Sequence, residues 1–313
     1  MATLLDYRRR IRSVKSTQQI TRAMKFVAAA KLRRAQEGVY SARPYAREIL
    51  RVMRSAAARI ESPVHPLLER RPEERVLVVV LTGDRSLCGA FNTNVIRRAI
   101  QFLREQEGKR RELVVVGKKG RDTLKKRGFD FVGEYLGVSA NVEFSSAKEI
   151  AAKIAERYAE REVDAVYAVY NEFKNVLVQK LQVQKLLPID PGVLVESAAE
   201  ADAPVGKMSP EISLPHEETP HGKTDDLVDY IYEEPVEEIF AGLVPRYLEA
   251  EVFRILLESA AAEHAARMTA MDSATRNASD LIERLTLEMN KIRQAGITKE
   301  LIEIVSGAAS AMS

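Results

Sequence analysis

The sequence contains a single cysteine, Cys88, no tryptophan and only four histidines in 313 residues. One cysteine excludes an intrachain disulfide and any metal cluster built on cysteine pairs, and Cys88 is expected to be a small buried hydrophobic residue. The histidines show no H-x-x-x-H spacing and no acidic metal-ligand pattern, so no metal site is predicted. They are His65, His216, His221 and His264.

Motifs for nucleotide binding and catalysis are also missing. There is no G-x-x-x-x-G-K-[ST] loop and no G-x-S-x-G elbow. The stretch TGDRSLCGAFN (82–92) offers only Gly83 and Gly89, which is a weak signal for a dinucleotide site. The stretch VGKKG (116–120) could hold an anion, but a solvated loop is favoured. We therefore expect no catalytic residue and no cofactor in this chain.

No apolar run is long enough for a membrane-spanning helix. The first residues, MATLLDYRRRIRSVK, lack the apolar stretch and cleavage site of a secretory signal. These absences predict a soluble, intracellular protein, although it could dock on a membrane complex.

Charge is distributed very unevenly along the chain. Residues 1–60 carry 15 Lys and Arg against 3 Asp and Glu, whereas residues 196–238 carry 13 acidic and 2 basic residues. A solvated helix face and an acidic loop would explain this pattern. A more specific interpretation is that the first helix faces an acidic partner.

Residues 1–62 are predicted to form one long helix. Positions spaced alternately by three and four residues form a largely apolar seam, which is typical of a coiled coil. Polar residues interrupt the seam at Gln18, Thr21 and Lys25, and Pro44 is expected to bend or briefly break the helix. The seam consists of Leu4, Tyr7, Ile11, Val14, Gln18, Thr21, Lys25, Ala28, Leu32, Ala35 and Val39.

Residues 74–195 are predicted to form a small α/β domain with a largely parallel, Rossmann-like sheet. The Val-rich runs RVLVVVLTG (75–83) and ELVVVGKKG (112–120) are typical of buried parallel strands. Helices are expected over 92–107, 119–127 and 146–161, the last capped by Ser146 with Glu149 three residues on. A hairpin at Lys174-Asn175 joins the last two predicted strands.

The remaining segments differ in character. Residues 196–228 are acidic and poor in large apolar side chains, which predicts a mobile loop, and 229–235 could return to the sheet edge as a strand. Residues 236–313 are predicted to form a second long helix, kinked near Pro245, with an apolar seam from Leu257 to Ile292 on which His264 is a tolerated member.

Two long helices at opposite ends of the chain would each expose an apolar seam if they stood alone. Pairing them solves this problem. The predicted architecture is therefore an α/β domain inserted between two terminal helices that form an antiparallel coiled coil.

Several stretches resemble the gamma subunit of F-type ATP synthase. They are RRRIRSVKSTQQITRAMKFVAAAKLRRAQ (8–36), LTGDRSLCGAFNTNV (81–95), DYIYEEP (229–235), AAEHAARMTAMDSATRNASDLI (261–282) and NKIRQAGITKELIEIVSGAASAM (290–312). The resemblance spans essentially the whole chain. It implies a non-catalytic rotor shaft that turns inside a ring of three alpha and three beta subunits and couples proton flow to ATP synthesis or hydrolysis. It also implies that the α/β domain lies on the epsilon subunit and the c-subunit ring, at the cytoplasmic face of the bacterial cell membrane.

The resemblance further implies which residues touch the ring. An acidic loop of beta would lie near Met24 and Lys25, and the polar break at Gln18, Thr21 and Lys25 would then be turned toward the ring. A second contact region maps to Arg293, Gln294 and Thr298, with Glu300 just beyond. The single Cys88 excludes the cysteine-pair switch of chloroplast members.

Two other functions remain open at the level of sequence. A basic coiled coil could be a scaffold that binds nucleic acid or acidic lipid, although no stacking platform of aromatic side chains or nucleic-acid-binding signature is present. An α/β enzyme with a coiled-coil oligomerisation arm would instead require a nucleotide site near residues 83–91.

Overall fold

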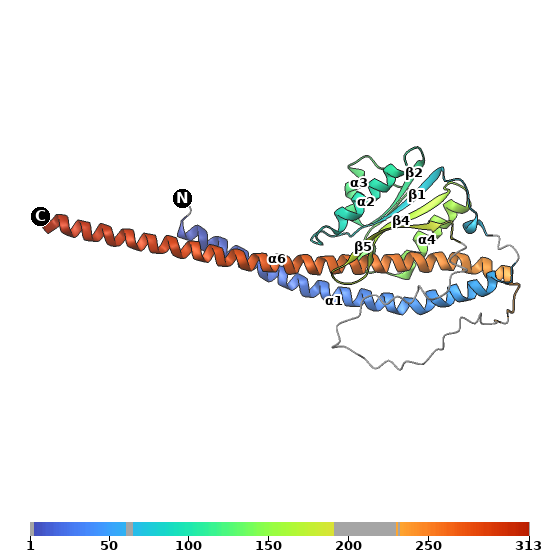
Figure 1. The fold of residues 1–313 in the computed structure, drawn as a ribbon, viewed down its shortest axis with the longest axis horizontal. Helices are drawn as coiled ribbons and strands as arrows, with labels where there is room; N and C mark the ends of the chain where they lie inside the picture. Colours follow the sequence, from blue (N-terminus) through green and yellow to red (C-terminus); the bar gives the residue numbers. More distant parts are fainter. Residues whose placement is uncertain (1–2, 61–64, 191–229, 231, 313) are drawn as a thin grey trace, which may run out of the picture. The chain divides into compact units, whose positions relative to one another are not determined.

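A computed structural model describes residues 3–60, 65–190, 230 and 232–312, and within the last helix the side chains of 303 and 307–312 are left undescribed. The chain divides into two compact units, one made of residues 1–29 and 267–313 and the other of residues 30–266. Both terminal helices contribute to each unit (Figure 1). The segment 196–228, expected to be an acidic loop, lies outside the described residues.

The centre of the second unit is a five-stranded sheet of order β3-β2-β1-β4-β5. The first four strands are parallel, and β5 pairs with β4 in the antiparallel sense. This confirms the largely parallel sheet predicted from the Val-rich runs. The strands are β1 Arg75–Leu81, β2 Arg110–Val116, β3 Gly133–Tyr135, β4 Ala165–Phe173 and β5 Gln179–Leu187.

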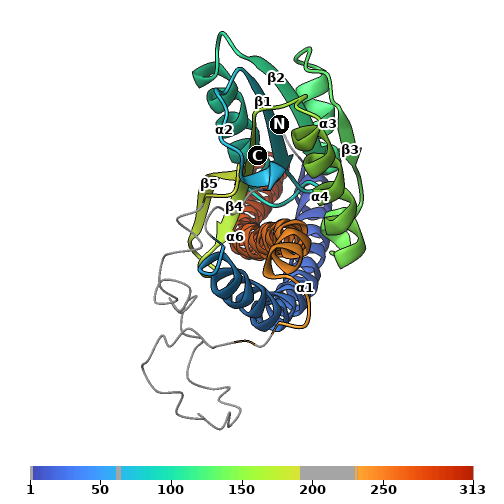
Figure 2. The same cartoon turned by 90° about the vertical axis from the view of Figure 1, so that its right-hand side faces the viewer.

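Helices cover both faces of the sheet because its central strands are apolar on both sides. On β1, Val76, Val78 and Val80 belong to the core shared with α2 and α3, whereas Leu77, Val79 and Leu81 belong to the core shared with α1, α4 and α6. Viewed end-on, α6 lies between the sheet and α1 (Figure 2). The short elements are α2 Phe91–Glu105, α3 Lys118–Lys125, α4 Phe144–Ala159, η1 Pro66–Leu68 and η2 Val138–Ala140.

The terminal helices are α1, Leu4–Ala57, and α6, Val236–Met312. Both run unbroken through their prolines, Pro44 and Pro245, so the brief break that was allowed for at Pro44 does not occur. A proline inside a helix costs about 3 kcal/mol. Packing offsets this cost. Val244 and Leu248 are buried around Pro245, and Ile49 and Met53 are buried within the three turns after Pro44.

Two local predictions are corrected. Helix α4 begins at Phe144 with Glu143 as N-cap, and no side chain caps it, so the cap assigned to Ser146 is wrong. Ser146 lies within the first turn, because the helix starts two residues earlier, at Phe144. The Phe144 ring packs edge-on against Phe253 of α6. Of the expected strand 229–235, residues 229 and 231 lie outside the described part, and the others are not in a strand. Cys88 is buried, as expected.

We expect Gly117→Ala to lower the free energy of unfolding far more than Gly128→Ala. Both glycines have positive φ, but a Cβ at Gly117 would overlap the carbonyl group of Thr82, whereas nothing lies within 4 Å of one at Gly128. Backbone strain alone predicts a cost of about 1–2 kcal/mol for Gly128→Ala, and the added overlap should bring Gly117→Ala to about 3 kcal/mol or more. Urea unfolding of the full chain measures both, and equal losses would contradict the close approach of Gly117 to Thr82.

Candidate partner-binding surface

The polar residues that interrupt the α1 seam all bond to α6. Gln18 Nε2 donates to Ser279 Oγ at 2.7 Å, the Thr21 and Thr275 hydroxyls lie 2.8 Å apart, and Lys25 Nζ lies 2.6 Å from Asp272 Oδ1. Gln18 and Thr21 therefore bond to α6 and do not turn toward a surrounding ring as expected, whereas the ring contact predicted for Lys25 stays a prediction, because its side chain is 40% exposed. A periodic seam identifies residues that share one stripe, and here that whole stripe faces the second helix.

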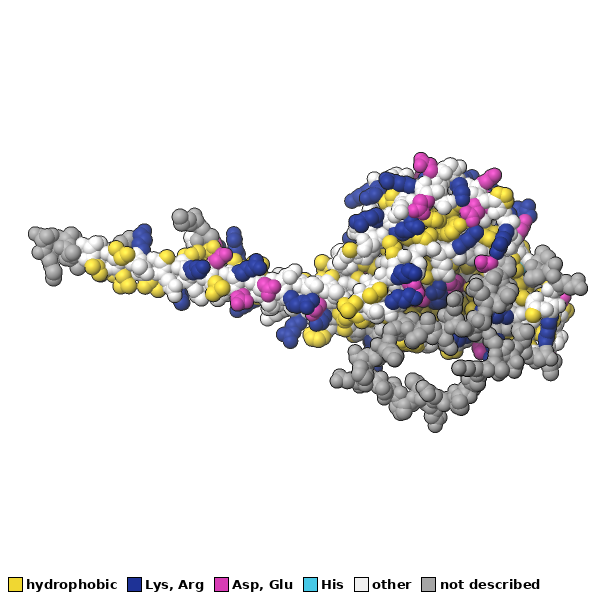
Figure 3. Space-filling view, viewed as in Figure 1, with side chains coloured by type: hydrophobic (Ala, Val, Ile, Leu, Met, Phe, Trp, Pro, Cys, Tyr) yellow, Lys and Arg dark blue, Asp and Glu magenta, His cyan; other side chains and the backbone are white. Residues whose placement is uncertain are grey.

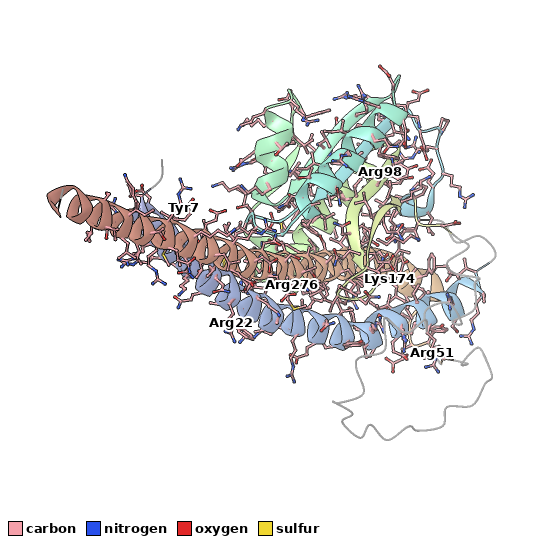
Figure 4. All side chains as sticks on the ribbon, turned by 60° about the vertical axis from the view of Figure 1, so that its left-hand side comes forward. Tyr7, Arg22, Arg51, Arg98, Lys174 and Arg276 are labelled. Atoms are coloured by element: carbon pink, nitrogen blue, oxygen red, sulfur yellow. The ribbon has the colours of Figure 1, made fainter. Side chains whose placement is uncertain are left out.

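These pairs fix the antiparallel register of the two helices. The positions descend along α6 as they rise along α1, and Tyr7 continues the series by hydrogen bonding to Glu288, which raises the pKa of Tyr7. Tyr7, Arg22 and Arg276 mark this stretch of the helices in Figure 4. Polar pairs at seam positions specify register at some cost in stability. A slip of one turn would leave the Thr21 hydroxyl, which is almost fully buried, without its partner.

The Lys25–Asp272 pair remains accessible to water. The two side chains are 40% and 32% exposed, so the pair is screened and contributes little to stability. The hydrogen bond from Lys25 nevertheless holds the pKa of the Asp272 carboxyl below its usual range. Lys25 is thus engaged within the chain while part of its side chain still faces solvent.

The other predicted contact residues lie at the surface. Met24 is half-buried, and Arg293, Gln294, Thr298 and Glu300 are exposed. The last four follow the residues of α6 that pair with the start of α1, so α6 continues alone through this region. The two predicted regions are not brought together by any interaction within the described part of this unit.

Large exposed apolar side chains were missed in the sequence. On α1, Ile20, Phe26 and Val27 are exposed, and on α6 a stripe at helical spacing follows Gln294. Soluble chains rarely leave such a stripe uncovered, so it marks a surface for other chains. The available signal was the pair Phe26-Val27, two large residues next to each other and off the seam. The α6 stripe consists of Ile297, Leu301, Ile304 and Val305.

A group of charged side chains ties α6 to the sheet within the second unit. Arg254 donates to both Glu251, at 2.6 Å, and Glu258, at 2.7 Å, and Gln184 of β5 donates to Glu251 at 2.6 Å. Burial opposes ionisation of Glu251, but the contact with Arg254 outweighs it and lowers the pKa of Glu251. Burial raises the pKa of Glu258. Tyr170 of β4 completes the group by donating to Gln184 Oε1 at 2.8 Å.

The loops at the carboxyl ends of the strands are filled by the chain's own carboxylates. Asp84 accepts hydrogen bonds from the backbone N–H groups of Lys118 and Gly137, so it occupies the position where VGKKG could hold an anion. The carboxylate of Glu263 lies against Gly83, where a dinucleotide would need to approach the backbone. No group of side chains in the described residues could hold a metal ion.

Comparisons with known proteins agree with this architecture. Residues 3–311 match the family model described as ATP synthase. The chain belongs to this family. A protein of Pelotomaculum thermopropionicum described as ATP synthase gamma chain is 47% identical over 310 residues, covering 99% of both chains. A Solibacter usitatus protein with the same description is 49% identical over 315 residues, covering 99% of this chain and 100% of the relative.

Solved structures share the fold of this ATP synthase family member. A chain of the Euglena gracilis mitochondrial ATP synthase structure of OSCP, F1 and c-ring aligns with a TM-score of 0.61 and 23% identity, covering 99% of this chain and 94% of that one. A chain of the Tetrahymena thermophila mitochondrial ATP synthase central stalk and c-ring aligns with a TM-score of 0.55 and 24% identity, covering 82% and 99%. The fold is that of the central-stalk rotor. Within its described residues, no helix is long and apolar enough to cross a membrane.

We expect Lys25→Met to raise the pKa of Asp272 toward its ordinary value, because the hydrogen bond from Lys25 is the largest cause of the lowered pKa. A lowered carboxyl pKa adds stability above the unfolded-state pKa, and this stability is lost as the pH falls through the folded-state pKa. Carboxyl-carbon NMR during an acid titration of the full chain measures the change. Arg276→Met is the matched control, because Arg276 Nη2 lies 3.1 Å from Asp272 Oδ2 but is a smaller cause of the lowered pKa than Lys25, so a smaller rise is expected. An unchanged Asp272 pKa in Lys25→Met would show that the pair does not form in solution.

Proposed function

We propose that this chain is the non-catalytic rotor of a bacterial proton-translocating ATP synthase, in which it couples proton flow to ATP synthesis or hydrolysis at the beta subunits. Membership of the gamma-chain family over 99% of the chain supports the rotor role and does not support a nucleic-acid or lipid scaffold. The observation that carries the proposal is the unit of residues 1–29 and 267–313, which pairs its polar seam inside and exposes large apolar side chains outside. Such a surface fits a shaft enclosed by other chains.

The filling of its loops supports the proposal that this chain has no catalytic site of its own. Asp84 and Glu263 occupy the backbone positions where an α/β enzyme would bind phosphate groups. We infer that nucleotide chemistry takes place on the partner subunits, and that this chain acts on them only by its shape and surface.

The proposed contacts with the alpha and beta subunits are Met24 and Lys25 on α1 and Arg293, Gln294, Thr298 and Glu300 on α6. All six reach solvent in the chain alone. Lys25 would contact the ring while it is paired with Asp272. The Asp272 carboxylate would then partly neutralise the positive charge that Lys25 presents to the ring. Exposed ion pairs contribute only about 0–1 kcal/mol each, which suits a surface that must be steered without being locked.

The α/β domain is proposed to rest on the epsilon subunit and the c-subunit ring. This places the chain at the cytoplasmic face of the membrane as a peripheral protein. The group of Arg254, Glu251 and Gln184 supports this role, because its partly buried charged hydrogen bonds fasten α6 to the sheet and would resist a torque on the domain.

Co-purification tests the rotor assignment most directly. A tagged chain expressed with alpha and beta subunits should be recovered in one complex with both of them. A chain that is recovered alone, although all three are soluble and folded, would contradict the assignment.

We expect Met24→Lys to impair coupling more than folding. The new ammonium group would add an ionic attraction to the acidic partner beside a lysine that is already paired. ATP hydrolysis should therefore continue while the number of protons pumped per ATP falls at least about twofold. Proton pumping and hydrolysis are measured on the same vesicles. Met24→Gln, which keeps a long unbranched side chain at the same position without the positive charge, is the matched control and should change neither. Unchanged coupling with intact assembly would count against the proposed contact at Met24.

A further inference from the structure

A groove of about 560 Å³ runs between α2 and α3 on the side of the sheet away from the terminal helices. Arg97 and Arg104 of α2 and Lys119 and Arg127 at α3 line it, and Ile96 and Ile100 form an apolar part of its wall. Lys and Arg side chains gather over this part of the α/β domain in the space-filling view (Figure 3). Neither proposed ring contact lies here, so the groove needs a separate explanation.

The charge of the groove is of one sign. No Asp or Glu lines it, and none of the ion pairs among the described residues involves its four cationic side chains. Two neighbouring cations on the same helices are paired, Arg98 with Glu105 and Arg121 with Asp122, each at 2.8 Å. Arg98 marks α2 in Figure 4. Four unpaired cations around one groove repel one another, and an anionic occupant would relieve that repulsion.

The positions of the cations match an elongated occupant. Each wall of the groove has a cation at both ends and a neutral polar side chain between them. The α2 wall has Arg97, Gln101 and Arg104, and the facing wall has Lys119, Thr123 and Arg127. At 1.5 Å per residue these stripes are about 10–12 Å long, several times the span of one phosphate group.

One end of the groove presents an unusual apolar residue. Leu87 lines it, is 57% exposed and has a φ of 66°, in the left-handed region that a leucine rarely adopts. Backbone strain of this kind persists only where the surrounding structure imposes it, and it is concentrated at binding and switch regions. Together with Ile96 and Ile100, Leu87 offers an apolar contact beside the charges.

We propose that the α2–α3 groove binds an acidic segment of a partner polypeptide, with carboxylates that meet the four cations and an apolar side chain that packs on Leu87, Ile96 and Ile100. A polypeptide supplies length, repeated negative charge and apolar contacts together. Inorganic phosphate or pyrophosphate would supply only the charge and would leave the apolar part of the groove exposed.

A direct binding measurement on the full chain tests the proposal. The probe is a fluorescein-labelled helical peptide of roughly sixteen residues, or about four turns, made of Glu, Ala and Leu with Glu at four-residue spacing. Fluorescence anisotropy should show saturable binding that weakens with added salt, and the same peptide with Gln in place of Glu should not bind. Binding of the two peptides with equal affinity would overturn the proposal.

A matched pair of variants locates the binding. Arg104→Glu with Arg127→Glu reverses two groove cations, and Lys125→Glu with Lys126→Glu makes the same change in net charge on exposed residues that do not line the groove. We expect the groove variant to weaken binding about tenfold or more and the control variant to weaken it less than about threefold, because only close charges couple strongly. Circular dichroism should match the unmodified chain for both, since all four positions are exposed.

Other outcomes assign the groove elsewhere. Equal weakening by the two variants would mean non-specific attraction and would overturn the proposal. Displacement of the peptide by pyrophosphate at comparable concentration would make it a general anion site. A chain that binds the peptide only after residues 196–226 are deleted would assign the groove to the chain's own acidic segment.

Discussion

The burial of one stretch of α6 on every side is the constraint on which the rest of the structure depends. From Ser259 to Ala265 every residue is buried, and four of the seven are alanines. A helix buried all round must be enclosed by its neighbours. Here the loop after β1 approaches so closely that the Glu263 carboxylate lies against Gly83. On α1, Gly38 leaves room for Leu257, which lies nearly two turns before Glu263 on α6. Small side chains let neighbouring elements approach α6 closely. The sheet, α1 and the loops therefore pack around this stretch of the helix.

The chemistry that holds α6 changes along its length. Within residues 30–266, apolar burial and the charged group around Arg254 fix the helix to the sheet. Within the unit of residues 1–29 and 267–313, hydrogen bonds between polar side chains join the two helices beside buried apolar side chains such as Ala28 and Met271. Each such bond contributes only about 0.5–1.5 kcal/mol. The polar hydrogen bonds therefore specify the register of the two helices and add little to stability. The apolar burial and the charged group around Arg254 hold α6 against the sheet.

The fold could be predicted from the sequence because its signals are local. Val-rich runs predicted the parallel strands, and two apolar seams predicted the paired helices. The predictions that failed concern tertiary contacts, which the spacing of residues along one helix does not reveal. Gln18, Thr21 and Lys25 were recognised as seam residues, but their partners Ser279, Thr275 and Asp272 lie about 250 residues away. Glu251, Arg254 and Glu258 have the spacing of solvated pairs on an exposed helix, so the bonds of Glu251 and Arg254 to Gln184 of β5 could not be recognised. The contacts assigned to Met24, Lys25 and the α6 residues from Arg293 to Glu300 remain predictions.

The continuation of α6 beyond its partner has a consequence for how the helix is maintained. From Arg293 to Leu301 every side chain is exposed, and no residue of α1 in the described part lies opposite. This end extends a helix that is already nucleated, but its apolar side chains are uncovered, so each further residue is only marginally favoured in water and the end frays. Its amide protons would therefore exchange rapidly in the isolated chain and slowly once other subunits surround it. The rigidity of this end is a property of the assembled machine rather than of the polypeptide that contributes it.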